Sequence, residues 1–248
     1  MTDLSALGFQ LIKGFADGYA LGAKRDELQS ILGGFEPQQG DVFKDSNLGS
    51  ILMNPAQRHA GVFAAILDHE RLWGGLKAAT ACRELAFIPE TSIHLNSYGD
   101  WHKDTRAQEV AKHYFHWTSF YQVFTVALYF QKNDPDTGGG LEVLPQSHRT
   151  QKTAHGSKGV AGTRLESDIG DAVIFDMRLD HKASWPSPGH PRAEKVALYF
   201  TVACPNSGGD LYMRFLKTRP DYVYLEHFKC PEVLQSVLKR HGVWLLAI

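Results

Sequence analysis

Net charge is nearly absent from this sequence. Its 26 lysines and arginines are balanced by 27 aspartates and glutamates, which gives a formal net charge of −1 at pH 7. Proteins that hold nucleic acids through the phosphate backbone need a basic surface, and no basic stripe runs along this chain. We therefore expect no nucleic-acid partner.

Cysteines and long apolar runs are also scarce. The 3 cysteines, Cys82, Cys204 and Cys230, are irregularly spaced, which predicts neither a disulfide framework nor a metal clip and favours a reducing compartment. No apolar run approaches the ~20 residues of a membrane span. Residues 1–15 lack the charged-then-apolar order of a signal peptide. These absences predict a cytoplasmic protein without a membrane partner.

The rest of the composition is that of an ordinary globular protein. Hydrophobic residues make up 43% of the 248 residues and charged residues 21%, which excludes a disordered chain. No repeat, low-complexity tract or long linker divides the sequence, so we expect one domain over 1–248. Within it we expect a helical buttress over about 1–90, a barrel core over about 91–216 and a C-terminal helix over about 231–240.

The order of the expected elements places helices before strands. After a short strand at 9–15, the spacing of apolar residues predicts a helix at 20–32 and one helix or a pair at 60–79. Further along, short alternating or apolar runs are bounded by Gly, Pro, Asn or Asp, which is typical of strands. These runs cover 91–98, 121–130, 141–145, 171–177, 195–203 and 211–216. Such an order is typical of α+β or barrel folds.

The strongest chemical signal is a histidine and an aspartate two residues apart. His102 and Asp104 follow a strand-like run and a turn, and in an extended segment residues i and i+2 point to the same side. They can therefore offer an imidazole nitrogen and a carboxylate oxygen to one cation, while Lys103 faces away. Alone, the pair is a weak signal, because a surface turn with a solvated aspartate gives the same pattern.

A third metal ligand must come from elsewhere in the chain. The best candidate is His181, which ends the segment GDAVIFDMRLDH (170–181), where an apolar strand leads into polar residues. Two histidines and one carboxylate on one face leave three open positions, which is the facial triad of non-haem Fe(II) oxygenases.

Four pieces of sequence follow one another in a specific order. They are HKD (102–104), GGGLEVLPQSH (138–148), GDAVIFDMRLDH (170–181) and Arg192, eleven residues after His181. This ordered set resembles the phytanoyl-CoA dioxygenase-like branch of the Fe(II)/2-oxoglutarate-dependent oxygenases, over about residues 9–205. The sequence departs from the family's pattern at PQSH, where a glycine more often separates Pro and Ser, and after the distal histidine, where it reads HKASW.

The resemblance implies a fold, a reaction and co-substrates. The fold would be mostly β with flanking helices, a double-stranded β-helix or jelly roll like that of cupins. His102, Asp104 and His181 would hold Fe(II), with 2-oxoglutarate and O2 as co-substrates. The enzyme would be a dioxygenase that hydroxylates, or otherwise oxidises, a C–H bond of a small molecule and releases succinate and CO2. Desaturation or cyclisation would use the same residues.

The resemblance also implies which residues hold 2-oxoglutarate. Arg192 stands where the family places the arginine for the far carboxylate, and a guanidinium can bind a carboxylate through two parallel hydrogen bonds. A surface arginine in a turn is the alternative, with Lys195 as the reserve candidate. Ser184 and the strand residues Thr125 and Tyr129 are further candidates. Which face of their strand lines the pocket stays open, and simple packing is an equal alternative for Tyr129.

Three residues near the metal motif are candidates for the substrate pocket: Trp101, Arg106 and Trp117. Packing is the plainer explanation for an aromatic residue near a strand end. A cupin-type metal enzyme that works without 2-oxoglutarate would share the barrel and the metal ligands, but it would have no use for Arg192. A non-catalytic barrel-fold binding protein would not need the complete set. The substrate and the oligomeric state stay open.

Overall fold

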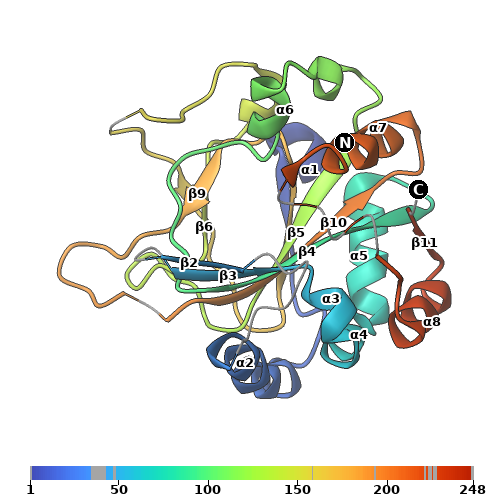
Figure 1. Cartoon of the computed structure of the whole chain (residues 1–248). Coiled ribbons are helices and arrows are strands. Elements are labelled where there is room, and N and C mark those ends of the chain that lie inside the picture. The colour runs from blue at the N-terminus through green and yellow to red at the C-terminus, as the bar shows by residue number, and fades with distance from the viewer. Residues whose placement is uncertain are drawn as a thin grey trace.

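The computed structural model describes residues 2–34, 43–46, 49–157, 159–192, 194–220, 222, 225 and 228–246. Two sheets and a set of helices make up this part of the chain (Figure 1). The larger sheet has eight strands, of which β11 (Val243–Leu245) pairs with β4. In spatial order the others are β1 (Phe9–Ile12), β8 (Ala172–Asp176), β5 (Val123–Tyr129), β10 (Val196–Ala203), β4 (Leu85–Leu95), β3 (Gly49–Met53) and β2 (Phe43–Ser46).

The smaller sheet has three strands, in the order β7 (Thr163–Arg164), β6 (Leu141–Val143) and β9 (His181–Ala183). Its apolar side chains pack on those of β5, β8 and β10. Between residues 85 and 203 the chain passes back and forth between the two sheets, as in a jelly roll. The predicted fold, a double-stranded β-helix with flanking helices, is confirmed.

Helices cover the other face of the larger sheet (Figure 1). The main ones are α2 (Gly18–Gly33), α4 (Ala60–Leu67), α5 (Glu70–Thr80) and α8 (Glu232–Arg240). They match the helices predicted at 20–32, 60–79 and 231–240, the second as a pair. Fully burying a large apolar side chain such as Leu72 or Leu76 contributes about 1.5–3 kcal/mol. Among the described residues, no helix combines the length and apolarity that crossing a membrane requires.

Short helices occupy the ends and the loops around the sheets. They are α1 (Asp3–Leu7), α3 (Pro55–Arg58), α6 (Arg106–Val110), α7 (Ser207–Leu216) and the 3-10 turns η1 (Tyr114–Trp117) and η2 (Ser147–Arg149). The strand predicted at 211–216 is wrong, because these residues belong to α7. Asn206 caps this helix by accepting the backbone N–H groups of Gly208 and Gly209. A short apolar run does not by itself distinguish helix from strand.

The cysteines also differ from the sequence expectation. Cys82, after α5, and Cys204, after β10, form a disulfide with a Cα–Cα distance of 5.9 Å, while Cys230 is a half-buried free thiol. The two bonded residues are 122 positions apart, so irregular sequence spacing concealed a pair that the fold brings together. Cysteine usage therefore gives no support for a reducing compartment.

Candidate metal centre

The two histidines of the predicted site face each other across the edge of the smaller sheet. An antiparallel bridge joins them through two backbone hydrogen bonds of 2.9 Å, from His102 N to His181 O and from His181 N to His102 O. Their ring centroids are 4.3 Å apart. His181, at the end of GDAVIFDMRLDH, therefore lies beside His102, in the segment after β4, because the two residues pair at the edge of the smaller sheet.

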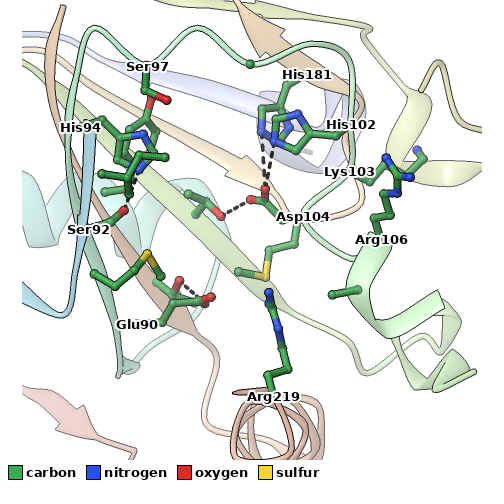
Figure 2. Close-up of a pocket in the computed structure, with 18 of the residues that line it drawn as sticks. Glu90, Ser92, His94, Ser97, His102, Lys103, Asp104, Arg106, His181 and Arg219 are labelled. Carbon is green, nitrogen blue, oxygen red and sulfur yellow. Dashed lines mark hydrogen bonds and ion pairs between the residues drawn. The ribbon is translucent and has the colours of Figure 1, made fainter. Parts of the chain in front are cut away.

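Asp104 completes the group from the same side as His102. Its Oδ1 lies 3.7 Å from His102 Nε2 and 3.5 Å from His181 Nε2. The second carboxylate oxygen accepts a 2.6 Å hydrogen bond from Thr125 Oγ1 on β5, which fixes the orientation of the carboxylate. One oxygen is thus held by the protein, and the other is directed toward the two imidazoles (Figure 2).

Backbone carbonyls set the tautomer of both imidazoles. His102 Nδ1 lies 2.7 Å from Asp100 O and His181 Nδ1 lies 3.0 Å from Leu179 O. A carbonyl only accepts, so each Nδ1 carries the proton and each Nε2 presents a lone pair. Burial lowers the pKa of His181 to about 4 and the nearby His102 ring adds to this, against the charge of Asp104, which raises it.

This donor set fits a divalent transition metal. The three ligand atoms lie within 4.8 Å of one another, and a hydrogen bond to the second nitrogen of each imidazole is the usual arrangement around metal-binding histidines. Two imidazoles and one carboxylate suit iron and related metals and leave open positions for other ligands. In the part of the chain that the structure describes, no other histidine, cysteine and carboxylate group meets the same geometric condition.

The three side chains open into a cavity of about 950 Å³ between the two sheets. Its wall includes residues of β4, β5, β8, β9, β10, α6 and α7. Figure 2 shows Ser92, His94 and Ser97 on one side of the cavity, the metal group across from them, and Glu90 and Arg219 at another end. This volume is in the range of small-molecule sites.

Two buried lysines near the cavity differ in the hydrogen bonds and ion pairs that their ammonium groups form. Lys103 turns away from the metal group and binds Asp180 at 2.9 Å and the carbonyls of Ser147 and Arg178. Lys195 is 3% exposed and lines the cavity. Its ammonium donates a 2.9 Å hydrogen bond to Ser97 O, and no carboxylate among the described residues forms an ion pair with it.

The candidates for 2-oxoglutarate contacts are placed differently from one another. Thr125 lines the cavity; the ring of Tyr129 is buried behind it, with its hydroxyl 3.3 Å from that of the cavity residue Tyr199. Arg192 is exposed and does not line the cavity; its guanidinium lies 4.9 Å from the Tyr98 ring centroid. Ser184 is buried and does not line the cavity, whereas Ala183, the last residue of β9, does.

The candidate substrate residues divide in the same way. Trp101 and Arg106 line the cavity, and Arg106 contacts His155 across its mouth. Trp117 lies in η1 and does not line the cavity. Sequence reasoning missed Glu90 and Tyr212, which both line it. The signal for Glu90 was its alternation with the polar residues Ser92 and His94 in the run LAFIPETSIHL, and the wrong strand at 211–216 concealed Tyr212.

Comparisons with known proteins agree with this fold. No protein-family model and no curated protein sequence matches the chain. Among solved structures, the non-heme alpha ketoglutarate dependent epimerase SnoN from nogalamycin biosynthesis is 13% identical, with a TM-score of 0.59 over 81% of this chain and 79% of that one.

Two further solved structures show the same likeness. HygX from Streptomyces hygroscopicus, with nickel and 2-oxoglutarate bound, is 13% identical, with a TM-score of 0.57 over 82% of this chain and 85% of its own. AviO1 from Streptomyces viridochromogenes Tue57 is 15% identical, with a TM-score of 0.60 over 82% and 92%. At these identities the likeness establishes a shared fold.

Proposed function

We propose that the protein is an Fe(II)- and 2-oxoglutarate-dependent oxygenase that oxidises a C–H bond of a small molecule. The observation that carries the proposal is the convergence of His102, Asp104 and His181 at the wall of a cavity large enough for two organic molecules. The ordered sequence segments support the phytanoyl-CoA dioxygenase-like branch within this superfamily. Bound iron, 2-oxoglutarate and O2 would supply the oxidant, with succinate and CO2 as the other products.

Lys195 is our candidate for the partner of the far carboxylate of 2-oxoglutarate. It has a buried ammonium group at the cavity wall, bound to a single carbonyl. An ammonium has three donors, so an entering carboxylate can accept the other two. Arg192 was the first candidate from the sequence, and its exposed position over Tyr98 favours it less. Ser184 and Tyr129 keep only an indirect role in this proposal, as residues behind the wall.

The remaining cavity residues hold and orient the reactants. Asp104 supplies the single negative ligand charge, and Thr125 holds its carboxylate in position. The Nδ1 hydrogen bonds keep both imidazole rings aimed at the metal position. The buried Phe175 and the partly buried Tyr199 line the same space and limit the access of water.

Solved relatives in fold support a small-molecule substrate. HygX has been solved with hygromycin B bound, with a TM-score of 0.53 to this chain, and SnoN is described as an epimerase. We propose hydroxylation as the simplest outcome for this chain. Epimerisation begins with removal of the same kind of hydrogen atom and would need the same ligands.

Release of labelled CO2 from 2-oxoglutarate tests the proposal. The purified protein with Fe(II), ascorbate and O2 should release CO2, and Asp104→Ala should abolish the release. Lys195→Ala should raise the KM for 2-oxoglutarate at least about tenfold, because a buried charged hydrogen bond is worth about 1.5–3 kcal/mol. Arg192→Ala is the matched control and should leave the KM within about twofold.

The same experiment separates the second candidate function. A cupin-type metal enzyme without 2-oxoglutarate would bind Fe(II) but show no affinity for 2-oxoglutarate and no CO2 release. If Arg192→Ala raised the KM and Lys195→Ala did not, the assignment of the carboxylate partner would be wrong while the proposed reaction would stand.

A further inference from the structure

Glu90 is a carboxylate on the cavity wall that the proposed chemistry does not use. It lies near the middle of β4, is partly exposed to the cavity, and faces it on the side opposite the metal ligands (Figure 2). The metal would neutralise Asp104 and Lys195 would take 2-oxoglutarate, so neither of those charges is left to serve Glu90. Among the described residues, no cation forms an ion pair with it.

The alternation of β4 places Glu90 on the cavity face together with Ser92 and His94, beside a bulge in the pairing of β4 with β10. Phe200 on β10 pairs with Thr91, but the next residue, Thr201, pairs with Ile88. Pro89 and Glu90 are therefore extra residues without partners in the ladder, and proline has no N–H to give one. A bulge redirects side chains and is common next to active sites. The backbone of Glu90 thus lies outside the ladder with β10, while its side chain faces the cavity.

All the donors that the described residues give Glu90 are neutral hydroxyl groups. Tyr222 donates to Oε1 at 2.5 Å, while Tyr212 and Thr201 donate to Oε2 at 2.7 and 2.8 Å. A carboxylate has about four acceptor sites, so one on Oε1 remains. Burial raises the pKa of Glu90, against the three hydroxyl hydrogen bonds that lower it, so the charge is only partly compensated.

The hydroxyl groups gather several acceptors around Glu90, while Arg219, the cation at this end of the cavity, lies over the Tyr222 ring, 4.5 Å from its centroid. Each of the three donates its one hydroxyl proton to Glu90, so the hydroxyl groups of Tyr212 and Thr201 can offer a ligand only their lone pairs. The same three residues line the cavity. A surface with one negative charge and several acceptors complements a group with a positive charge and several donors, which is a primary ammonium.

We propose that Glu90 anchors an ammonium group of the substrate, so that the substrate class is amine-bearing small molecules. This inference rests on the proposed function, because it assumes that metal and 2-oxoglutarate occupy the other part of the cavity. The body of the substrate would pack on Phe215 and Met53, which belong to the same apolar cluster as Tyr212 and Tyr222. An anionic group here would meet the uncompensated charge of Glu90.

Three probes of equal chain length test the charge preference. The holoprotein, loaded with Mn(II) and 2-oxoglutarate, is titrated calorimetrically with hexylamine, hexan-1-ol and hexanoate at neutral pH, where the amine is protonated like a lysine side chain. Hexylamine should bind at least about tenfold more tightly than either of the others, as expected for a charged hydrogen bond in a buried site.

Variants at position 90 test whether Glu90 is the source of the preference for hexylamine. Glu90→Gln keeps the size of the side chain and should remove the preference for hexylamine, while Glu90→Asp keeps the charge and should retain part of it. Glu84→Gln makes the same change of net charge at an exposed site just before β4 and should have no effect. Should Glu90→Gln fold poorly, Glu90→Asp and wild-type protein still give the comparison.

Each other outcome overturns the inference. Equal binding of hexan-1-ol would indicate a site for neutral hydroxyls, and tighter binding of hexanoate would indicate an anion site. No binding of hexylamine, or a preference that survives Glu90→Gln, would place the amine elsewhere, for example on the metal. The affinities for Mn(II) and 2-oxoglutarate are measured in the same samples. Their loss in the wild-type protein would contradict the proposed function, whereas their presence without an amine preference contradicts only this inference.

Discussion

The two faces of the larger sheet differ in what their buried side chains do: one face forms the apolar core and the other lines the cavity. On β10, Val196, Leu198 and Val202 pack in the apolar core beneath the helices, and Phe200 packs there while it also borders the cavity. The alternate positions Lys195, Tyr199 and Thr201 line the cavity on the opposite face. The strand period of two thus separates a dry, fully packed face from one that carries charges and hydroxyl groups.

This difference indicates which buried groups serve the fold and which serve a ligand. Buried polar groups are normally paired within the protein, because an unpaired one costs about 1–3 kcal/mol. On the cavity face, Lys195 and Glu90 keep unused hydrogen-bonding capacity. We therefore expect changes on the helix face to lower stability without affecting binding, and changes on the cavity face to do the reverse.

The disulfide on the helix side should give the largest change in stability. The double substitution Cys82→Ala and Cys204→Ala opens a link between residues 122 positions apart and should lower the free energy of unfolding by about 4–5 kcal/mol. Urea denaturation measures this, and Cys230→Ala is the control. Calorimetric Mn(II) affinity should stay unchanged at a temperature where the variant is folded; a parallel loss would erase the distinction between the two faces.

The two buried lysines test the distinction within one residue type. Lys103→Met leaves Asp180 buried without its ion-pair partner and should lower the free energy of unfolding by about 3–5 kcal/mol. Lys195→Met removes one hydrogen bond to a carbonyl and weaker contacts of the ammonium with three tyrosine rings, whose centroids lie 5.7–5.9 Å away. It should lower the free energy of unfolding by only about 1–2 kcal/mol, while weakening 2-oxoglutarate binding. Denaturation curves of both variants measure the two free energies of unfolding. Equal losses of stability would contradict the view that Lys103 serves the fold and Lys195 a ligand.

Asp104→Ala should weaken metal binding by at least about a hundredfold, because it removes a ligand and its charge and even outer-shell changes cost 10–100-fold. Stability should change little, since the Asp104 side chain is 23% exposed. Asp136→Ala, with a side chain 65% exposed, is the control of equal charge. Mn(II) titration measures the effect, and a retained affinity would mean that the three residues do not form the metal site.

The smallest effect on metal affinity should come from disturbing the orientation of the Asp104 carboxylate. Thr125→Val keeps the shape of the side chain but removes the hydrogen bond to Asp104 Oδ2, and it should weaken Mn(II) binding about tenfold. Thr91→Val on β4 is the matched control, because the Thr91 hydroxyl has no hydrogen-bond partner among the described residues. We expect Thr91→Val to leave metal affinity unchanged; an equal loss in both would assign the effect to the sheet rather than to the hydrogen bond.

The sequence could predict those parts of the site that depend on local geometry. The spacing of His102 and Asp104 places them on one side of an extended segment, and the apolar strand before His181 marks its position. The sequence could not decide whether Arg192 or Lys195 is the better candidate for the 2-oxoglutarate carboxylate. The answer depends on where β10 begins, because its first residue sets which side chains alternate toward the cavity. With the strand starting at Val196, Lys195 falls in phase with the cavity face.

Features that depend on distant partners were beyond sequence reasoning. The Cys82–Cys204 bond joins the end of a helix to the end of a strand, and no local pattern reports that contact. Tyr212 reaches the cavity only because residues 207–216 form a helix, which the capping by Asn206 decides. Glu90, by contrast, shares the cavity face with Ser92 and His94 through the alternation of β4, which a strand predicted from residue 85 instead of 91 would have included.

The bulge at Pro89 and Glu90 also has an evolutionary consequence. These two residues make no ladder contacts with β10, so a mutation there leaves the pairing of the sheet intact, and Asp104 and Thr125 lie on other segments. Under the proposed function, the substrate preference and the metal chemistry can therefore change independently in this scaffold. A lineage, or a protein engineer, could exchange the side chain at position 90 for an amide, a hydroxyl or a cation and recruit the same metal centre for a different metabolite.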